Sequence, residues 1–239
     1  MEAISEAFAG AFKTERLVFR AMEDTEAHKD WLFKNLWDNP VNFGLATPAT
    51  FVPQTRKAFN KDIETITSNS LLAVFICLPK KKEEPRSAQT SDQAEEEEAG
   101  DDDKKKAAGQ DGEGDVTKIG MMVMGKNSNF MFRRRTGIGI QIVDEHQNRG
   151  YGREAINWAL DWAFTFGDMH RVDIGTTSYN ERAAALYKSI GFRLEGVKRE
   201  SVFMNRQWHD HIELGMLVHE WEELRGLSGN KHARTEVEK

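Results

Sequence analysis

The sequence predicts one α/β domain, residues 1–225, built on a largely antiparallel sheet. Two observations carry this prediction. The 239 residues suit a single sizeable core together with some unstructured segments. Segments with strand periodicity and segments with helical periodicity follow one another as strand, two helices, three strands, helix, strand, helix and two strands. This order describes seven strands and four helices.

Each element has its own local signal. Strands are expected at residues 16–20, 71–78, 118–124, 137–143, 171–176, 193–203 and 208–217, and helices at 25–37, 53–67, 150–166 and 180–189. The third helix has the clearest pattern, because Ile156, Leu160 and Ala163 recur at helical spacing. The fourth helix begins after Asn180, a residue that caps helices well, and stops at Gly191. The last two strands form a closing hairpin.

Residues 80–117 are expected to form a disordered acidic insert within the domain, and residues 226–239 a loose C-terminal tail. Between positions 80 and 115 there is no aromatic residue and no Ile, Leu, Val or Met, so this segment cannot bury enough surface to offset its ordering entropy. It separates two strand-like runs, and we interpret it as an expanded hairpin loop. Two kinds of role stay open: a solvated loop, or a functional segment that attracts a cationic substrate electrostatically or docks a basic partner.

Charge and hydropathy exclude several classes of partner. The insert carries 13 acidic and 7 basic side chains, which account for the net charge of −6. The sequence shows no basic patch that would bind nucleic acid. The sequence contains no run of 18 apolar residues, so we expect no membrane span. The N-terminus lacks the features of a secretory signal. A lone cysteine, Cys77, favours an intracellular location. We expect a cytoplasmic protein, with access to the nucleus left open.

A helix start rich in glycine carries the first chemical signal. A strand ends near Val143, and a short loop then leads through Gln147 and Gly150 to Gly152 at the start of the third helix. The free backbone N–H groups and the dipole of a helix N-terminus favour an anion, and glycines let a phosphate approach closely. Two basic residues of this segment, Arg149 and Arg153, add positive charge. From the residues alone, this is either a site for a diphosphate or a simple glycine-rich turn between a strand and a helix.

A second signal lies one helix later. The segment 180–192, NERAAALYKSIGF, follows a short strand and places Tyr187 on the apolar stripe of its helix. The tyrosine hydroxyl must reach a polar environment. From the residues alone it is either a core tyrosine or a functional one.

The two signals together resemble a known family. Gln147-x-x-Gly150-x-Gly152 resembles the Gln/Arg-x-x-Gly-x-Gly/Ala signature of the GNAT acetyltransferases, and the segment 180–192 is similar to their second coenzyme-contacting helix. The closing hairpin and the segment 14–20, TERLVFR, resemble the branch that contains ribosomal-protein N-terminal (RimJ/RimL-like) and spermine/spermidine acetyltransferases. The resemblance covers about residues 14–79 and 118–221. It implies a GNAT fold, a V-shaped splay between the fourth and fifth strands, acetyl-CoA as co-substrate and, as is common in this branch, a homodimer.

The resemblance also implies a role for each matching residue. Tyr187 would be catalytic, donating a proton to the departing CoA thiolate. The pantetheine arm would pair with the backbone of Ile140 and Ile142 and would contact Asn180. The diphosphate would be held by the loop and helix start, that is, by Gln147, Asn148, Arg149, Gly150, Tyr151, Gly152 and Arg153.

The implied reaction is direct attack of an amine on the thioester. The acceptor stays open among a small amine, a polyamine and a protein N-terminus, with the first two slightly favoured by the resemblance. A carboxylate would serve as base, and the candidates are Asp144, Glu145, Asp173, Asp210 and Glu213. The alternative is a non-catalytic CoA-binding protein that acts through the acidic insert.

Two rival motifs are weaker. The run from Gly120 to Lys126 approaches a Walker A loop, but it lacks the final Ser/Thr and its middle is strand-like. On a strand, His209 and His211 would share a face and could offer two metal ligands, but no third ligand lies nearby in sequence. We interpret both histidines as structural residues of the hairpin and expect no metal.

Overall fold

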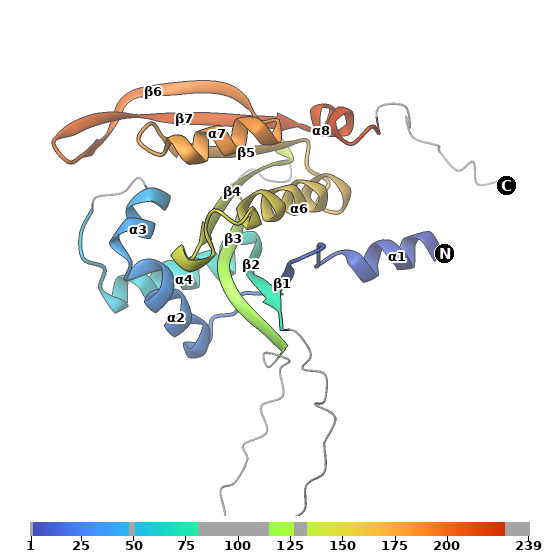
Figure 1. Cartoon of the computed structure of the whole chain (residues 1–239), viewed down its shortest axis with the longest axis horizontal. Coiled ribbons are helices and arrows are strands. Elements are labelled where there is room, and N and C mark those ends of the chain that lie inside the picture. Colours follow the sequence, from blue (N-terminus) through green and yellow to red (C-terminus); the bar gives the residue numbers. More distant parts are fainter. Residues whose placement is uncertain (1, 48–50, 81–114, 127–132, 228–239) are drawn as a thin grey trace, which may run out of the picture.

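A seven-stranded sheet forms the centre of the computed structural model, which describes residues 2–47, 51–80, 115–126 and 133–227 (Figure 1). The strand order is β1-β2-β3-β4-β5-β7-β6. Neighbouring strands are antiparallel except β4 and β5, which are parallel. The strands are β1 (Val18–Ala21), β2 (Ser70–Pro79), β3 (Val116–Gly125), β4 (Arg135–Ile142), β5 (Arg171–Thr177), β6 (Arg193–Met204) and β7 (Gln207–Leu217). The predicted α/β class and the seven strands are confirmed.

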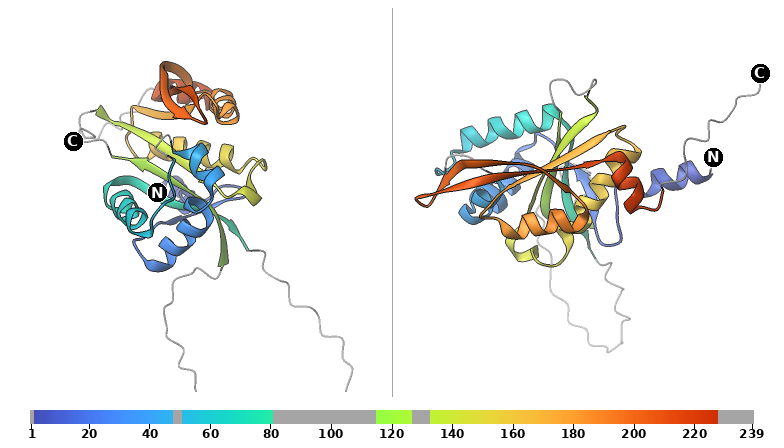
Figure 2. Two further views of the ribbon diagram at one scale, coloured as in Figure 1. Left: turned by 90° about the vertical axis from the view of Figure 1, so that its left-hand side faces the viewer. Right: turned by 90° about the horizontal axis from the view of Figure 1, so that it is seen from above.

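Helices cover both faces of the sheet (Figure 2). The four predicted helices correspond to α2 (Glu26–Leu32) with the π-helical turn η1 (Phe33–Trp37), α4 (Arg56–Asn69), α6 (Tyr151–Thr165) and α7 (Glu181–Ile190). Among the described residues, three further α-helices were not predicted, α1 (Glu2–Gly10), α3 (Pro40–Ala46) and α8 (Val218–Leu224), nor was the short 3-10 helix η3 (Asp144–His146). Each of these α-helices has nine residues or fewer, too short for a clear helical period in the sequence.

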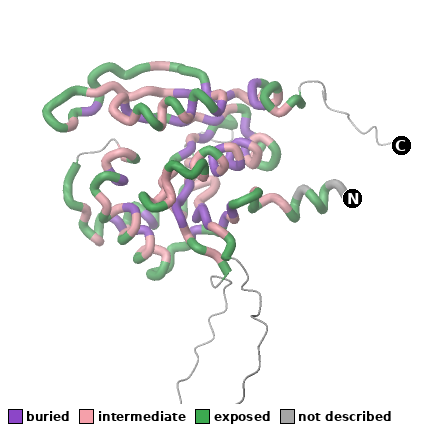
Figure 3. The backbone as a smooth tube through the Cα atoms, viewed as in Figure 1, coloured by how far each residue is buried: buried purple, intermediate pink, exposed green. Residues whose placement is uncertain are grey.

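Two apolar clusters hold these layers together. The larger one joins the sheet to α6 and α7 and includes Ile156, Leu160 and Tyr187. The smaller one lies on the other face, under α2, η1 and α4, and includes Phe59 and Cys77. The buried segments follow the central strands and the inner sides of these helices, whereas α1 and much of the β6–β7 hairpin are exposed (Figure 3).

The N-terminal segment is fixed to α6 by one carboxylate. Glu154 accepts hydrogen bonds from the hydroxyl of Thr14 at 2.5 Å and from the backbone N–H of Arg16 at 2.9 Å, and it forms an ion pair with the Arg16 guanidinium. Burial alone would raise the pKa of Glu154, but these hydrogen bonds outweigh it and lower the pKa. The contact therefore ties β1 to the helix that begins at the glycine-rich loop.

Strands β4 and β5 separate after a short paired stretch. They pair only from Arg135 to Gly137 on β4 and from Arg171 to Asp173 on β5. Beyond this point each strand continues without the other, which opens the sheet toward the carboxyl ends of both strands. The splay expected between the fourth and fifth strands is therefore present.

The acidic insert and the C-terminal tail remain predictions, because residues 81–114 and 228–239 lie outside the described residues. The ends of the insert are defined, however. Pro79 pairs with Val116, and the backbone N–H of Lys80 donates to the carbonyl of Asp115 at 2.9 Å. The insert therefore connects two hydrogen-bonded neighbouring strands, as a hairpin loop does.

Candidate functional site

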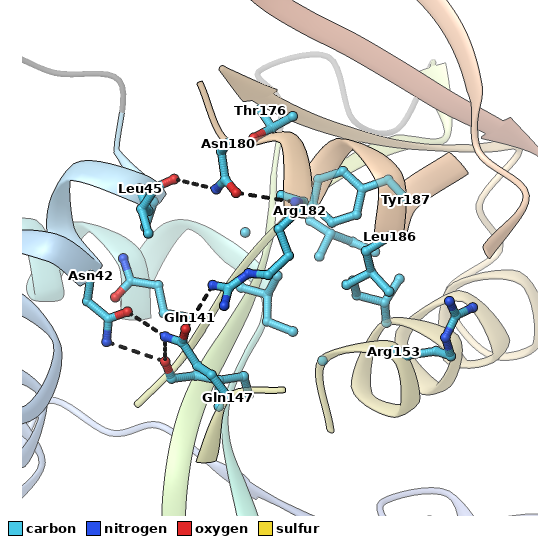
Figure 4. A pocket seen from close by; sticks show the side chains of 18 of the residues that line it. Asn42, Leu45, Gln141, Gln147, Arg153, Thr176, Asn180, Arg182, Leu186 and Tyr187 are labelled. Carbon is cyan, nitrogen blue, oxygen red and sulfur yellow. Dashed lines mark hydrogen bonds between the residues drawn. The ribbon is translucent and has the colours of Figure 1, made fainter. Parts of the chain in front are cut away.

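A cavity of about 400 Å³ lies in the splay between β4 and β5. Its walls come from β4, β5, the loop before α6, the first turns of α6 and α7, and helix α3 (Figure 4). The predicted residues that line it are Ile140, Ile142, Gln147, Asn148, Gly150, Tyr151, Gly152, Arg153, Asn180 and Tyr187. Arg149 is the predicted residue that does not line it. Two segments about 35 residues apart thus meet in one cavity, as the motifs predict.

The glycine-rich end of the cavity is a helix start without a side-chain cap. Gly150 is the N-cap of α6, with a left-handed φ of 83° that glycine adopts without strain. Because glycine has no side chain, it forms no cap hydrogen bond with the N–H groups of the first turn. These N–H groups and the helix dipole are therefore available to an anion.

Gln147 is the hub of the loop that precedes this helix. Its side-chain N–H groups donate to the carbonyl of Ile142 at 2.9 Å and to Oδ1 of Asn42 at 2.8 Å, and its Oε1 accepts from Arg182 at 2.8 Å. These contacts join β4, α3 and α7 (Figure 4). The Gln147 side chain therefore positions the loop, which leaves backbone groups to contact a ligand.

The cationic side chains differ from the prediction in their placement. Arg182, which the sequence analysis missed, lines the cavity and donates to the side chains of Gln147 and Asn148. Arg153 also lines it, and its guanidinium is held by the hydroxyl of Ser189 at 2.6 Å. Arg149 contributes its backbone carbonyl to Arg16 at 3.1 Å. Two guanidinium groups, that of Arg153 on α6 and that of Arg182 on α7, thus line the same cavity as the start of α6.

Asn180 caps α7 and connects it to α3. Its Oδ1 accepts from the backbone N–H of Ala183 at 3.2 Å, which confirms it as the N-cap. Its side-chain N–H donates to the carbonyl of Leu45 at 3.2 Å, and the neighbouring Tyr179 hydroxyl donates to the carbonyl of Gly44 at 2.8 Å. The C-terminal turn of α3 therefore lies against the cavity, a placement that residues so far apart in sequence could not reveal.

Tyr187 lines the cavity from α7 (Figure 4). Its ring packs in the larger cluster with 8% of the residue exposed, edge-on to Phe192. Burial raises the pKa of Tyr187 to about 12. The phenol is therefore uncharged at physiological pH and can donate a hydrogen bond into the cavity.

The five carboxylates proposed as bases lie elsewhere among the described residues, since the cavity lining contains none of them. Asp144 accepts from Asn39, Asp173 is paired with Arg135 and Arg171, and Asp210 accepts from the backbone of Glu200. The salt bridge to Lys198 lowers the pKa of Glu213, and Glu145 is exposed. Four of the five are thus bonded to other groups, namely Asp144, Asp173, Asp210 and Glu213.

Two histidines that the sequence analysis did not select line the cavity, His146 and His211. The interpretation of His211 as a structural hairpin residue is therefore incomplete. His209 packs edge-on against Tyr179. Among the described residues, no cluster of His, Cys, Asp and Glu side chains could hold a metal ion.

The run from Gly120 to Lys126 is mainly strand β3, so it is not a phosphate-binding loop before a helix. In the part of the chain that the structure describes, no helix has both the length and the apolar character to cross a membrane.

Comparison with known proteins points to one family. The acetyltransferase (GNAT) family model matches residues 75–192. Spermidine N(1)-acetyltransferase of Vibrio cholerae is 38% identical over 71 residues, which are 30% of this chain and 41% of that protein. The [ribosomal protein uS5]-alanine N-acetyltransferase of Escherichia coli is 25% identical over 84 residues, 35% of this chain and 43% of that protein. The matched segments thus span less than half of these relatives.

Similarity in fold covers more of the chain than similarity in sequence does. A crystal structure of spermidine N-acetyltransferase from Vibrio cholerae, in complex with CoA and spermine, covers 87% of this chain and 99% of its own, with a TM-score of 0.62 and 20% identity. On its family match, its fold and its glycine-rich helix start, the chain belongs to the GNAT family of acetyltransferases.

Proposed function

We propose that this protein transfers an acetyl group from acetyl-CoA to a primary amine by direct attack in a ternary complex. One observation carries the proposal: a single cavity joins an uncapped, glycine-bearing helix start to a buried, protonated tyrosine through the gap between two diverging strands. Acetyl-CoA carries a diphosphate that fits the helix start and, at the end of its pantetheine arm, a thioester that would lie beside the tyrosine.

The coenzyme would lie along the cavity with its diphosphate at the α6 N-terminus. Backbone N–H groups from Gln147 to Gly152 would contact the diphosphate, and Arg182 and Arg153 would add positive charge. The pantetheine arm would extend past Ile140 and Ile142, whose strand is unpaired on the side facing β5 beyond Gly137. An unpaired strand edge offers backbone hydrogen bonds to an extended ligand.

The chemistry follows from this placement. The amine nitrogen attacks the thioester carbonyl, the C–N bond forms and the C–S bond breaks. Tyr187 would donate its phenolic proton to the departing thiolate. Backbone N–H groups on the free edge of β4 can stabilise the negative charge on the carbonyl oxygen, and holding both reactants in one cavity supplies proximity.

By their names, these relatives acetylate two kinds of amine, spermidine and an alanine of ribosomal protein uS5. Among the described residues, no aspartate or glutamate lines the cavity. The additional ammonium groups of a polyamine would therefore lie outside it. We propose a small primary amine or a polyamine as the acceptor, with the reacting nitrogen inside the cavity.

The test is acetyl-CoA turnover with a panel of propylamine, spermidine and a peptide that begins with alanine, combined with calorimetry of CoA binding. We expect CoA binding, and turnover with at least one of the two non-peptide amines. Turnover with the peptide alone would contradict the proposed acceptor. CoA binding without turnover of any amine would contradict the transferase function.

Gly152 offers a test of the diphosphate position. A Cβ at this residue would lie 3.8 Å from Leu186, an ordinary contact, so Gly152→Ala should fold normally. The added methyl group would nevertheless point into the cavity where a phosphate must approach the backbone. We expect CoA affinity to fall on the order of tenfold, about 1.4 kcal/mol. Calorimetry would measure it, and unchanged affinity would place the diphosphate elsewhere.

A further inference from the structure

The cavity reaches the face of the sheet opposite to Tyr187. Side chains of β5 alternate, so Val172 and Ile174 pack in the cluster that contains Tyr187, whereas Gly175 and Thr177 face the other side. Thr177 pairs directly with His211 on β7, which places their side chains on that same face. Gly175, Thr177 and His211 all line the cavity.

The His211 ring leans over β5. A Cβ added at Gly175 would lie 2.9 Å from Nε2 and 3.1 Å from Cε1 of His211. The ring therefore occupies the space that any side chain at residue 175 would take. Glycine at this position lets the imidazole reach from β7 across β5 toward the splay.

Two further oxygens on the same face lack partners. Gln141 alternates with Ile140 and Ile142 on β4, so its side chain faces away from α6. Its Oε1 and the Oγ1 of Thr177 are buried, and neither has a hydrogen-bond partner among the described residues. Thr177 is only 4% exposed. Buried polar atoms are normally paired, so these two are suited to a ligand that donates hydrogen bonds.

The charged groups around His211 are already engaged with one another. On β6, Lys198 lies opposite His211 and forms a salt bridge with Glu213, which is two residues along β7 on the same face. Asp173 on β5 is paired with Arg135 and Arg171. Within the described chain, the cavity has no carboxylate that could accept a proton, and the His211 ring has no hydrogen-bond partner.

We propose that His211 accepts the proton of the attacking amine, in a subsite completed by Gln141 and Thr177. This inference rests on the proposed acetyl transfer. Of the two N–H groups of the neutral amine, one would donate to the imidazole and the other to Oε1 of Gln141 or Oγ1 of Thr177. As the C–N bond forms, the proton on nitrogen passes to the imidazole while Tyr187 supplies a proton to sulfur. The products are the amide and free CoA; the imidazole then releases its proton to solvent, and the Tyr187 phenolate takes one up from solvent.

The test compares His211→Gln with the wild-type chain in acetyl-CoA turnover, using propylamine or, where it is the better acceptor, spermidine. We expect kcat to fall on the order of a hundredfold with little change in CoA affinity. The acidic limb of the wild-type pH profile of kcat should flatten in the variant. In His211→Ala, added imidazole should restore part of the activity.

Two further variants test whether the effect is specific to the imidazole of His211. His209→Gln makes the same change on the same strand face, outside the cavity lining, and should keep kcat within about threefold, well short of the loss of a general base. Gly175→Ala displaces the ring while leaving residue 211 intact, and should reproduce the defect of His211→Gln.

The outcomes separate this inference from the function itself. If the wild-type chain acetylates an amine but His211→Gln keeps its kcat, the proton acceptor is another group. The same conclusion follows if the variant loses activity equally at every pH and imidazole rescues nothing. If the wild-type chain acetylates no amine, the proposed function fails.

Discussion

Replacing Tyr187 by phenylalanine is expected to lower kcat about a hundredfold, at the low end of the range for a general acid because a thiolate is a good leaving group. CoA affinity should change little, since the ring and its contact with Phe192 remain. The fold should also remain. Burial is the only cause of the raised pKa of Tyr187, and no hydrogen bond contributes to it, so the substitution breaks no such bond of the hydroxyl. The variant removes a proton donor and nothing else.

The pH dependence provides a second measurement. Burial raises the pKa of Tyr187 to about 12, so the neutral phenol persists to strongly alkaline pH. An acid with a raised pKa loses its proton only as the pH approaches that value, so the wild-type kcat should show no basic limb from this group between neutral and mildly alkaline pH. A basic limb that disappears in Tyr187→Phe would contradict this assignment.

Tyr179→Phe is the matched control. It removes a hydroxyl that donates to the carbonyl of Gly44 at 2.8 Å, outside the cavity lining. We expect a loss of unfolding free energy of about 1 kcal/mol and a small effect on kcat. Steady-state kinetics and urea denaturation of both variants would separate catalysis from stability. Equal loss of kcat in the two variants would contradict the role of Tyr187 as the proton donor.

The features that the sequence could predict are local ones. The start of α6 depends on Gly150 and its neighbours, and the start of α7 depends on Asn180 and a bond to the N–H three residues later. All seven strands could be placed from local strand-like runs, such as the apolar run from Leu71 to Leu78, because each run is continuous in the sequence. The resemblance then related the two motifs to one family, and the structure brings them together in one cavity.

The features that the sequence could not predict depend on distant contacts. The carboxylates looked like candidate bases, but Asp173 faces Arg135, a residue on the neighbouring strand 38 positions away. Arg182 is held at the cavity by a hydrogen bond to Gln147, which lies 35 positions away in the sequence. His211 became visible only through the register of β5 and β7 and the missing side chain of Gly175. Pairing of this kind is set by the sheet and leaves no local pattern.

Replacing Phe59 by alanine is expected to cause the largest loss of stability, about 3–5 kcal/mol of unfolding free energy. Phe59 is fully buried and lies edge-on to Phe33 and Trp37 of η1, with ring centroids 5.1 and 5.2 Å away. Its removal would leave a cavity between α4 and η1 that the neighbouring aromatic rings can fill only in part. This loss is a large share of the total stability of a typical domain.

The same substitution should also affect the catalytic cavity. Trp37 ends η1 three residues before Pro40, the first residue of α3, and Asn42 of α3 donates to the carbonyl of Ile142 at 3.3 Å. Loosening η1 would therefore loosen one wall of the cavity. We expect the KM for the amine to rise while Tyr187, on the other face of the sheet, keeps its surroundings.

Urea denaturation measures the first effect and steady-state kinetics the second. Phe203→Ala is the matched control, because Phe203 is 56% exposed and should lose no more than about 1 kcal/mol. The denaturation midpoint of Phe59→Ala should fall well below that of the control with an unchanged m-value. Equal midpoints would mean that the smaller cluster contributes little to stability. α3 would then depend for its position on Asn42, Tyr179 and Asn180, which bond it to β4 and to the segment before α7.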